Sequence, residues 1–458
     1  MVANGYFVHN PATGETESSR DFDSDDEIRT KLERSAAAYE RWRQVPLAER
    51  ASALAKLAEG LRAESKQLAH ILAREVGKPL DQGEFEVELA ASIASHYASN
   101  AEKLLAPNPI EVSGAERVEV HYLPVGGLLG IMPWNFPFYQ FLRFVAPNVL
   151  LGNTVVLKPA PQCPESAEAF GRIADAAGLE GVVQITYASV PQVEQIIASP
   201  AIRGVSLTGS DRAGRAVAEI AGKNLKKVVL ELGGSDPFIV LSDADLDAAV
   251  AQAVGGRFFN GGQACNSAKR TIVEAEVYPA FLEKFADAVA QLRVGDPLEA
   301  GVAVGPVASE AAQRTLMEQI SDATDRGAKL LVGGDAGREG PGYWVTPTVL
   351  TDVQPGMRSY HEEVFGPVAT VYRAENEDDA IRIANDCDYG LGASVHSSNI
   401  ERALSVGARV NSGMLFINEA TATSAEMPFG GIGRSGFGRE LGVQGVREFA
   451  NERLVRIK

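Results

Sequence analysis

Three side chains that lie far apart in the sequence could together carry out acyl chemistry. Cys265 follows two glycines in FFNGGQACNSAKR, Glu231 closes the apolar run KVVLEL, and Asn135 follows a Pro-Trp pair in IMPWNFPFYQ. A thiolate can attack a carbonyl carbon, an amide can donate to the oxyanion that forms, and a carboxylate can activate the water that releases the product. These residue types therefore predict a reaction that passes through a thioester.

Each of the three residues also has a structural interpretation. An isolated cysteine is often a small buried side chain, a glutamate at a strand end can pair with a lysine, and an asparagine after a turn can form an Asx turn. Cys265 has small, polar neighbours, whereas Cys163 precedes a proline and Cys387 lies between two aspartates, which repel a thiolate. A carboxylate at a buried strand end, such as Glu231, is costly unless it is paired or functional. These observations favour the chemical interpretation.

The segments around these residues predict an α/β protein. Residues 24–105 begin with a capping box, Ser24 and Glu27, and then repeat Ala and Leu at three- and four-residue spacing. This pattern predicts three or four amphipathic helices, one of which ends at Gly77. From Val125 onward, short apolar runs alternate with helical segments, as in a buried and mostly parallel sheet.

A second αβ series and a β-hairpin are also expected. The series begins after Gly233, with strands at PFIVL and over residues 270–278. Residues 110–123 come close to polar and apolar alternation around Ser113 and Gly114, which is the pattern of a hairpin. The final segment, REFANERLVRIK, is expected to be either an edge strand or a fraying tail.

Composition and charge exclude several classes of protein. With 458 residues, 45% hydrophobic and 22% charged, the chain has the balance of a globular protein and the length of roughly three domain-sized units. Its 43 basic and 60 acidic side chains give a net charge of −17, which argues against a nucleic-acid or anionic-membrane partner. Three cysteines in unrelated contexts provide no disulfide framework, so a cytoplasmic location is expected. No stretch approaches the ~20 apolar residues of a membrane span.

Two apparent motifs carry no chemistry. Residues 431–436, GIGRSG, match GxGxxG but follow no strand, so an ordinary Rossmann fingerprint is rejected. His361 and Glu362 begin an HExxH-like string, but Phe365 stands where the second histidine would be. Because the six histidines are scattered, no metal site is expected.

Seven segments, in order along almost the whole chain, resemble the successive signatures of the aldehyde dehydrogenase superfamily. They are MPWNFPF (132–138), VVLKPA (155–160), SLTGS (206–210), LELGGSDPFIV (230–240), NGGQACNSAKR (260–270), EEVFGPV (362–368) and MPFGGIGRSGFGRE (427–440). The resemblance implies an α/β fold with a variant Rossmann cofactor domain, a second α/β catalytic domain and a β oligomerisation arm. The implied pieces are 1–109, 124–231 and 417–440 for the cofactor domain, 232–416 for the catalytic domain, and 110–123 with 441–458 for the arm. A homodimer or homotetramer is expected.

The same resemblance implies a role for each reactive residue. Cys265 would attack the aldehyde, and hydride transfer to nicotinamide would leave a thioester. Asn135 and the backbone N–H of Cys265 would hold the oxyanion, and Glu231 would activate the hydrolytic water. The presence of both Cys265 and Glu231 favours a hydrolytic enzyme over the CoA-acylating relatives, in which that glutamate is typically absent.

The resemblance also implies where a dinucleotide would lie. The implied contacts are Trp134 beside the nicotinamide, Lys158 on the adenosine ribose, Gly209 and Ser210 at the pyrophosphate, Glu363 and Phe365 at the nicotinamide ribose, and in addition Gly214 and Leu232. Gly209 and Ser210 open a predicted helix, whose N-terminus attracts phosphate. Strongly NAD-selective members carry a glutamate three residues after the lysine, where this chain has Pro161. Without that carboxylate a 2′-phosphate is not repelled, so NADP is expected to be preferred over NAD.

Arg143 indicates one substrate class within the family. It lies nine residues after Trp134, where succinate-semialdehyde dehydrogenases carry an arginine that binds the far carboxylate. Thr423 stands where that subfamily has a serine. The expected reaction is therefore NAD(P)-dependent oxidation of succinate semialdehyde to succinate. The alternatives are a broad-specificity enzyme for uncharged aldehydes, in which Arg143 forms a structural ion pair, and a catalytically silent binding protein of the same fold.

Overall fold

The N-terminal region forms helices, as its apolar spacing predicts. In the computed structural model, which describes residues 5–338 and 340–458, the helices are α1 (Asp25–Trp42), α2 (Leu47–Ala63), α3 (Ser65–Val76), α4 (Leu80–Ser99) and the single turn α5 (Ala101–Leu104). The Ser24–Glu27 capping box is present, and Gly77 ends α3 with a φ of 74°, in the left-handed region that favours glycine. A hairpin of β1 (Gly5–His9) and β2 (Thr16–Asp21) precedes them. Residues 1–4 of the predicted 1–109 segment lie outside the described residues.

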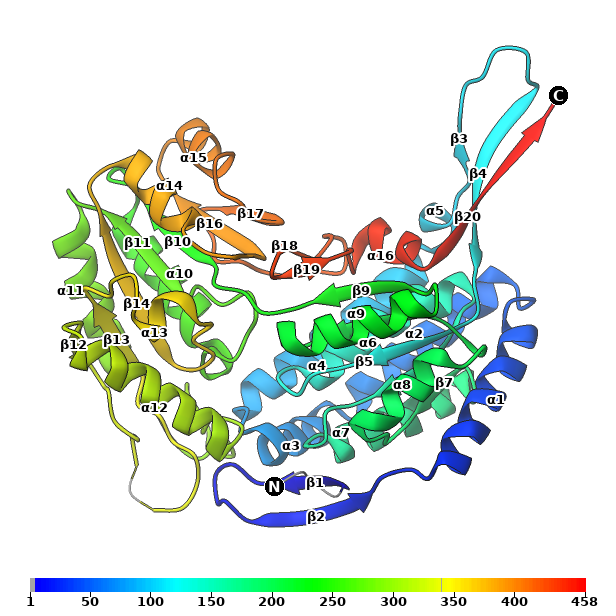
Figure 1. Cartoon of the computed structure of the whole chain (residues 1–458), viewed down its shortest axis with the longest axis horizontal. Helices are drawn as coiled ribbons and strands as arrows, with labels where there is room; N and C mark the ends of the chain where they lie inside the picture. Colours follow the sequence, from blue (N-terminus) through cyan, green and yellow to red (C-terminus); the bar gives the residue numbers. More distant parts are fainter. Residues whose placement is uncertain (1–4, 339) are drawn as a thin grey trace.

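A six-stranded sheet forms the lobe on the right of Figure 1. Its strands are β5 (Gly127–Ile131), β6 (Thr154–Lys158), β7 (Val183–Ile185), β8 (Ile202–Thr208), β9 (Lys227–Glu231) and β19 (Gly436–Phe437), in the order β19-β9-β8-β5-β6-β7. Only β19 runs antiparallel to its neighbour. The connections contain α6 (Pro137–Leu151), α7 (Pro164–Ala174) with a π-helical turn (Asp175–Leu179), α8 (Val190–Ala198) and α9 (Asp211–Lys223).

The order of these strands defines a binding edge. The chain proceeds from β5 outward to β7, and then returns to β8 and β9 on the other side of β5. In open α/β sheets, ligands bind beyond the carboxyl ends of the strands at such a switch point, here between β5 and β8. Asn135 follows the carboxyl end of β5, and Gly209 and Ser210 follow that of β8. Glu231 is the last residue of the adjacent strand β9.

A seven-stranded sheet forms the other lobe. Its strands are β10 (Pro237–Val240), β11 (Arg270–Glu274), β12 (Lys329–Val332), β13 (Thr348–Thr351), β14 (Val368–Ala374), β16 (Gly392–His396) and β17 (Met414–Ile417), in the order β12-β13-β14-β11-β10-β16-β17. The helices are α10 (Leu246–Phe258), α11 (Tyr278–Ala290), α12 (Glu310–Asp325), α13 (Arg358–His361), α14 (Glu377–Asn385) and α15 (Ile400–Gly407). Only β12 is antiparallel to its neighbour, so the prediction of mostly parallel sheets is confirmed. The strand expected over 270–278 ends at Glu274, because a turn follows it and α11 begins.

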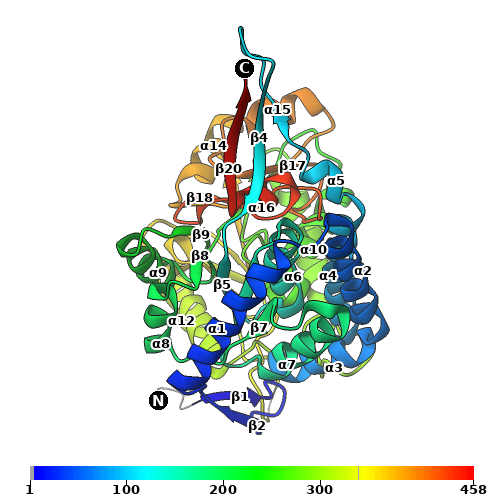
Figure 2. The same ribbon diagram turned by 90° about the vertical axis from the view of Figure 1, so that its right-hand side faces the viewer.

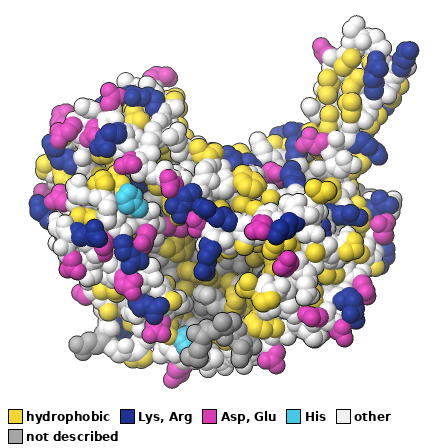
Figure 3. Space-filling model, viewed as in Figure 1, with side chains coloured by type: hydrophobic (Ala, Val, Ile, Leu, Met, Phe, Trp, Pro, Cys, Tyr) yellow, Lys and Arg dark blue, Asp and Glu magenta, His cyan; other side chains and the backbone are white. Residues whose placement is uncertain are grey.

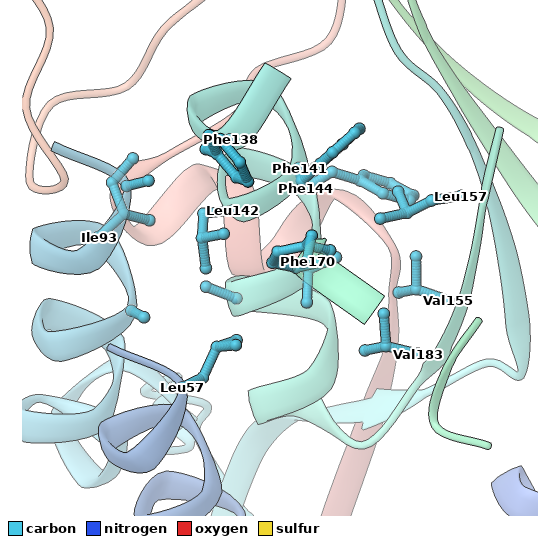
Figure 4. Packing of buried hydrophobic residues seen from close by; sticks show 14 of the residues in the cluster. Leu57, Ile93, Phe138, Phe141, Leu142, Phe144, Val155, Leu157, Phe170 and Val183 are labelled. Carbon is cyan, nitrogen blue, oxygen red and sulfur yellow. The ribbon is translucent and has the colours of Figure 1, made fainter. Parts of the chain in front are cut away.

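Helix α6 lies at the centre of the largest apolar core. All of its residues are buried, and Figure 4 shows Phe138, Phe141 and Phe144 on this helix beside Leu157 of β6 and Phe170 of α7. Burying each phenylalanine side chain stabilises the fold by about 1.5–3 kcal/mol. The helix that follows Asn135 is therefore anchored on every side.

A three-stranded arm projects from the lobes, as Figures 1 and 2 show. It consists of β3 (Asn108–Pro109), β4 (Arg117–Pro124) and β20 (Ala450–Ile457), in the order β20-β4-β3 and fully antiparallel. A hairpin is therefore present near the predicted range of 110–123, but its first strand lies earlier, at residues 108–109, and its second strand is 117–124, with Gly114 at a φ of 76° in the connection. The C-terminal segment is an edge strand, which is one of its two expected forms. The remaining short elements are β15 (Tyr389–Gly390), β18 (Ile432–Gly433) and α16 (Gly442–Glu448).

No helix within the described ranges is long and apolar enough to cross a membrane.

Candidate active site

Glycine residues shape the loop that carries Cys265. Helix α10 continues into a 3-10 segment (Phe259–Gly262) whose two glycines have φ of 60° and 70°. A Cβ on Gly262 would lie 2.3 Å from the carbonyl oxygen of Gly366, so only glycine fits at this approach. The chain can therefore turn sharply and present Cys265, which is partly exposed, just before β11.

Four charged side chains influence the ionisation of Cys265. Burial raises the pKa of its thiol to about 11. The positive charges of Arg143 and Lys269 oppose this rise, and the carboxylates of Glu231 and Glu363 add to it. Because the thiolate is the nucleophilic form, the positive charges near Cys265 favour its reaction.

Asn135 is held against the same loop by its own backbone and side chain. Its Nδ2 donates to the carbonyl oxygen of Gln263 over 2.9 Å. Its backbone carbonyl oxygen accepts from Lys78 Nζ at 2.8 Å and from Asn260 Nδ2 at 3.0 Å. Asn135 is buried, and one N–H of its amide is left for another acceptor. An amide fixed in this way can donate to an oxyanion next to Cys265.

A buried ion pair that no sequence motif indicates supports this arrangement. Lys78 pairs with Glu86, and both side chains are fully buried. Oε1 of Glu86 accepts from the backbone N–H of Phe138 at 2.9 Å and, more weakly, from that of Tyr139 at 3.4 Å, so Glu86 satisfies donors in the first turn of α6. The Lys78 ammonium also lies 3.7 Å from the ring centre of Phe136. A glutamate on the buried face of α4 is the sequence signal that could have revealed the pair.

Glu231 lies at the carboxyl end of β9 and is 2% exposed. Neither of its carboxyl oxygens has a hydrogen-bond partner among the residues that the structure describes, and no lysine pairs with it there. Burial raises the pKa of Glu231 well above its usual value, and Arg143 partly opposes the rise. The salt bridge to a lysine, which was the structural interpretation of Glu231, is therefore absent from the described residues. A free carboxylate with a raised pKa is suited to act as a general base.

Two cavities meet at Cys265, and Asn135 and Gln140 line both of them. The smaller cavity, of about 200 Å³, has six of the eight predicted cofactor residues in its wall: Trp134, Gly209, Ser210, Leu232, Glu363 and Phe365. The larger cavity, of about 430 Å³, is lined by α4, α6, α10 and residues 419–423. A small carbonyl compound in one cavity and a planar ring in the other could both reach Cys265.

The other two predicted cofactor residues lie outside these cavities. Burial lowers the pKa of Lys158 to about 8, and its ammonium donates to the carbonyl oxygen of Pro159 at 3.2 Å. No carboxylate pairs with Lys158 within the described ranges, so a phosphate would supply the missing negative charge. Gly214 allows α9 to approach the strand segment, since a Cβ there would lie 2.7 Å from Leu232 Cδ2. Both residues fit a bound dinucleotide.

The N-terminus of α9 faces the switch point of the sheet. Ser210 is its N-cap, and the Ser210 Oγ accepts from the N–H of Ala213 at 3.3 Å. The remaining N–H groups of this first turn and the helix dipole attract phosphate. The pyrophosphate position that the resemblance implies therefore agrees with the fold.

Comparison with known proteins decides the family. The model of the aldehyde dehydrogenase family matches residues 3–455. The chain belongs to the aldehyde dehydrogenase family. A relative from Deinococcus radiodurans, succinate-semialdehyde dehydrogenase (NADP(+)), is 47% identical over 448 residues, which cover 98% of this chain and 94% of the relative. A relative from Mycobacterium tuberculosis H37Rv, succinate-semialdehyde dehydrogenase (NADP(+)) 1, is 42% identical and covers 98% of both chains.

Solved structures agree with this assignment. The crystal structure of succinic semialdehyde dehydrogenase from Streptococcus pyogenes in complex with NADP+ is 40% identical, covers 99% of both chains and has a TM-score of 0.96. The expected aldehyde-dehydrogenase-like fold, with a Rossmann-like lobe and a second α/β lobe, is therefore confirmed.

Arg143 of this aldehyde dehydrogenase family member lies in the wall of neither cavity. Its side chain is fully buried, its Nε pairs with Glu440, and its Nη2 donates to Thr208 Oγ1 at 2.9 Å. Burial alone would lower the pKa of Arg143, but the Glu440 carboxylate raises it overall. The structure thus shows the structural ion pair that was the alternative interpretation of Arg143, because the Glu440 carboxylate already pairs with its guanidinium. Contact with a substrate carboxylate stays a prediction.

We expect Arg143→Ala to destabilise the fold because it leaves Glu440 buried without its partner. The free energy of unfolding should fall by about 3–5 kcal/mol, measured by urea unfolding. The double variant Arg143→Met, Glu440→Leu should lose less than Arg143→Ala alone, since it removes both charges. A normal unfolding free energy, together with a loss of turnover confined to carboxylated aldehydes, would instead assign Arg143 to substrate binding.

Thr423 does line the larger cavity, together with Tyr139. Their hydroxyl groups are hydrogen-bonded at 3.0 Å. Tyr139 was not expected from the sequence, because its partner lies on a distant segment of the chain. The two hydroxyls lie in a wall that combines aromatic side chains with polar ones such as Gln140 and Asn266.

Proposed function

We propose that the protein oxidises succinate semialdehyde to succinate with NADP. The observation that carries this proposal is the position of Cys265, which lies where a cavity large enough for a small aldehyde meets a cavity lined by six of the eight expected cofactor residues. Further support comes from relatives at 42% and 47% identity that bear the name succinate-semialdehyde dehydrogenase. The free carboxylate of Glu231 supports hydrolysis of a thioester over transfer to CoA.

Each residue of the proposed mechanism performs one step. The thiolate of Cys265 attacks the aldehyde carbon, and the oxyanion that forms accepts hydrogen bonds from Asn135 Nδ2 and the Cys265 backbone N–H. Bound NADP supplies the acceptor for the hydride. Glu231 then removes a proton from the water that attacks the thioester, and the carboxylate product leaves as the sulfur is released. Burial of Glu231 favours this step, because a raised pKa makes the carboxylate a stronger base.

The preference for NADP rests on charge. The position three residues after Lys158 is Pro161, which has no carboxylate to repel a 2′-phosphate. Lys158 has no carboxylate partner in the described part of the chain and can pair with that phosphate. The relative crystallised with NADP+ at 40% identity agrees with this proposal.

Initial rates with two aldehydes and two cofactors test the proposed function. We expect kcat/KM to be at least about tenfold higher for succinate semialdehyde than for butanal, and for NADP than for NAD. The measurement is the absorbance of the reduced cofactor. A preference for NAD would contradict the role of Lys158 and Pro161, and turnover that requires CoA would contradict hydrolysis.

The wall of the larger cavity favours a second candidate function, the oxidation of uncharged aldehydes. Five aromatic side chains line it: Phe85, Phe136, Tyr139, Phe259 and Phe429. Among the described residues in this wall there is no lysine or arginine. Equal rates with butanal and succinate semialdehyde would select this broad-specificity enzyme.

We also propose that the chain divides as the family resemblance implies and that its arm assembles subunits. Strand β20 is an edge strand of the arm, so its free backbone groups can pair with another chain. Ile110, Val112 and Leu454 are exposed on the arm, and Figure 3 shows hydrophobic side chains along it. A homodimer or homotetramer would cover them.

Leu454→Glu should shift the protein toward monomers. Leu454 is 61% exposed, and a carboxylate there would be buried unpaired in an interface. The molar mass by light scattering after size exclusion is the measurement. Leu225→Glu is the matched control, because Leu225 is 96% exposed but lies outside the arm. An unchanged mass for Leu454→Glu would contradict an assembly role for β20.

A further inference from the structure

Lys269 is a buried cation that the proposed mechanism does not use. It lies four residues after Cys265 and is 2% exposed. Its Nζ donates to the carbonyl oxygens of Ala264 at 2.8 Å and of Cys265 at 2.7 Å. The same ammonium pairs with Glu363 Oε1 at 3.1 Å. One side chain therefore joins the loop of the nucleophile to a residue of the other cavity.

The surroundings of Lys269 belong to the wall of the smaller cavity. Glu363 and Phe365 both line that cavity, and the Lys269 ammonium lies 5.7 Å from the ring centre of Phe365. Phe365 in turn meets the ring of Trp134 edge-on at 5.7 Å. Oε1 of Glu363 also accepts from the N–H of Gly234 at 3.0 Å. Lys269 thus lies directly behind the groups that a bound ring would touch.

The backbone has little freedom where the segment after β9 meets the loop of Cys265. A Cβ on Gly234 would lie 2.4 Å from the Cys265 carbonyl oxygen, so the strand segment and the nucleophile loop are in close contact. Without the ammonium, the Cys265 carbonyl would have no partner among the described residues. The Ala264 carbonyl would keep only the N–H of Ser267 at 3.3 Å, and Glu363 Oε1 only that of Gly234, so the loop would have to rearrange to hydrate these groups.

We propose that Lys269 is a positioning residue that links occupation of the dinucleotide cavity to the reactivity of Cys265. Lys269 fixes the loop through two carbonyl groups and places a positive charge near the thiolate. When a ligand interacts with Glu363, the ion pair between Glu363 and Lys269 weakens. The positive charge of Lys269 then acts more strongly on the thiolate of Cys265. This inference rests on the proposed function only in taking the smaller cavity as the dinucleotide site.

The charges that bear on this coupling surround Cys265 and Lys269. Arg143 and Lys269 favour the thiolate, while Glu231 and Glu363 oppose it. Asp236, which is buried, also interacts with Lys269, and burial raises the pKa of Asp236 to about 7. The partner of Arg143, Glu440, lines neither cavity, whereas the partner of Lys269, Glu363, lines the smaller one, so Lys269 is the cation whose ion pair a ligand can alter.

The test follows the alkylation of Cys265 by iodoacetamide as a function of pH, with and without NADP, by mass spectrometry of the peptide. In the wild type we expect NADP to lower the midpoint of the pH profile. In Lys269→Gln the midpoint should rise by roughly one pH unit and no longer respond to NADP. Lys269→Arg, which keeps the charge, should restore most of the response. The variant Cys265→Ser, which lacks the thiol, should not be alkylated at this position and so identifies the labelled peptide.

Lys226→Met is the matched control. Lys226 also donates to two backbone carbonyl oxygens, those of Ile197 and Ser199, but it lines neither cavity. Its pH profile should equal that of the wild type. A Lys269→Gln profile identical to the wild type overturns the proposal, as does an NADP response that persists in that variant. Because labelling needs no turnover, a failure of the aldehyde assay would count against the proposed function and leave this test intact.

Discussion

Replacement of Cys265 by alanine is expected to lower kcat for aldehyde oxidation by at least about 10,000-fold, because no other cysteine is found among the described residues that line the two cavities. Binding of NADP should persist, since the backbone that lines the smaller cavity is unchanged. Reduced-cofactor formation gives the rate, and quenching of tryptophan fluorescence reports cofactor binding through Trp134, which lines that cavity.

Cys387→Ala provides the control for the alanine variant. Cys387 is a partly exposed free cysteine that lines neither cavity, so its removal should leave kcat within about twofold of the wild type. Substantial turnover by Cys265→Ala would show that the sulfur is not the attacking group. Loss of activity in both variants would indicate a general sensitivity of the fold to cysteine replacement.

Glu231→Gln should slow thioester hydrolysis by about 100- to 10,000-fold, the usual contribution of a general base. The first hydride transfer does not need this carboxylate, so a burst of reduced cofactor equal to the enzyme concentration should precede a slow steady state. In the wild type, hydrolysis should increase with pH through the raised pKa of Glu231, because only the carboxylate form accepts a proton. The variant should lose this dependence.

Rapid-mixing absorbance distinguishes the two phases of the Glu231→Gln reaction. Glutamine keeps the shape of the side chain and removes a buried acid that has no partner in the described part of the protein, so the fold should tolerate the change. A steady-state rate equal to that of the wild type would contradict the assignment of the base. A burst that disappears together with the steady state would place Glu231 in the first step instead.

The sequence predicts those parts of the site that depend on local chemistry. Cys265 is recognisable from the glycines and small polar residues around it, and Glu231 from a charge that ends an apolar strand. Parallel sheets follow from short apolar runs alternating with helices. These signals are local because each requires only the geometry of one turn or one strand end.

Other parts of the site depend on partners that no local pattern reveals. Arg143 has the position expected of a substrate ligand, but the fold brings Glu440 to its guanidinium and removes it from the cavity wall. Lys78 supports Asn135 from 57 residues earlier in the chain. Such contacts depend on how the helices pack, and a buried charge in the sequence shows only that some partner must exist.

Pairing of β9 with β19 has a consequence for the synthesis of the protein. The strand that presents Glu231 has β8 on one side, but its other neighbour, residues 436–437, is synthesised long after β9. Until then this edge of β9 is open in the nascent chain. Chains that terminate between the two strands should therefore be inert and should expose a sheet edge that chaperones and proteases can recognise.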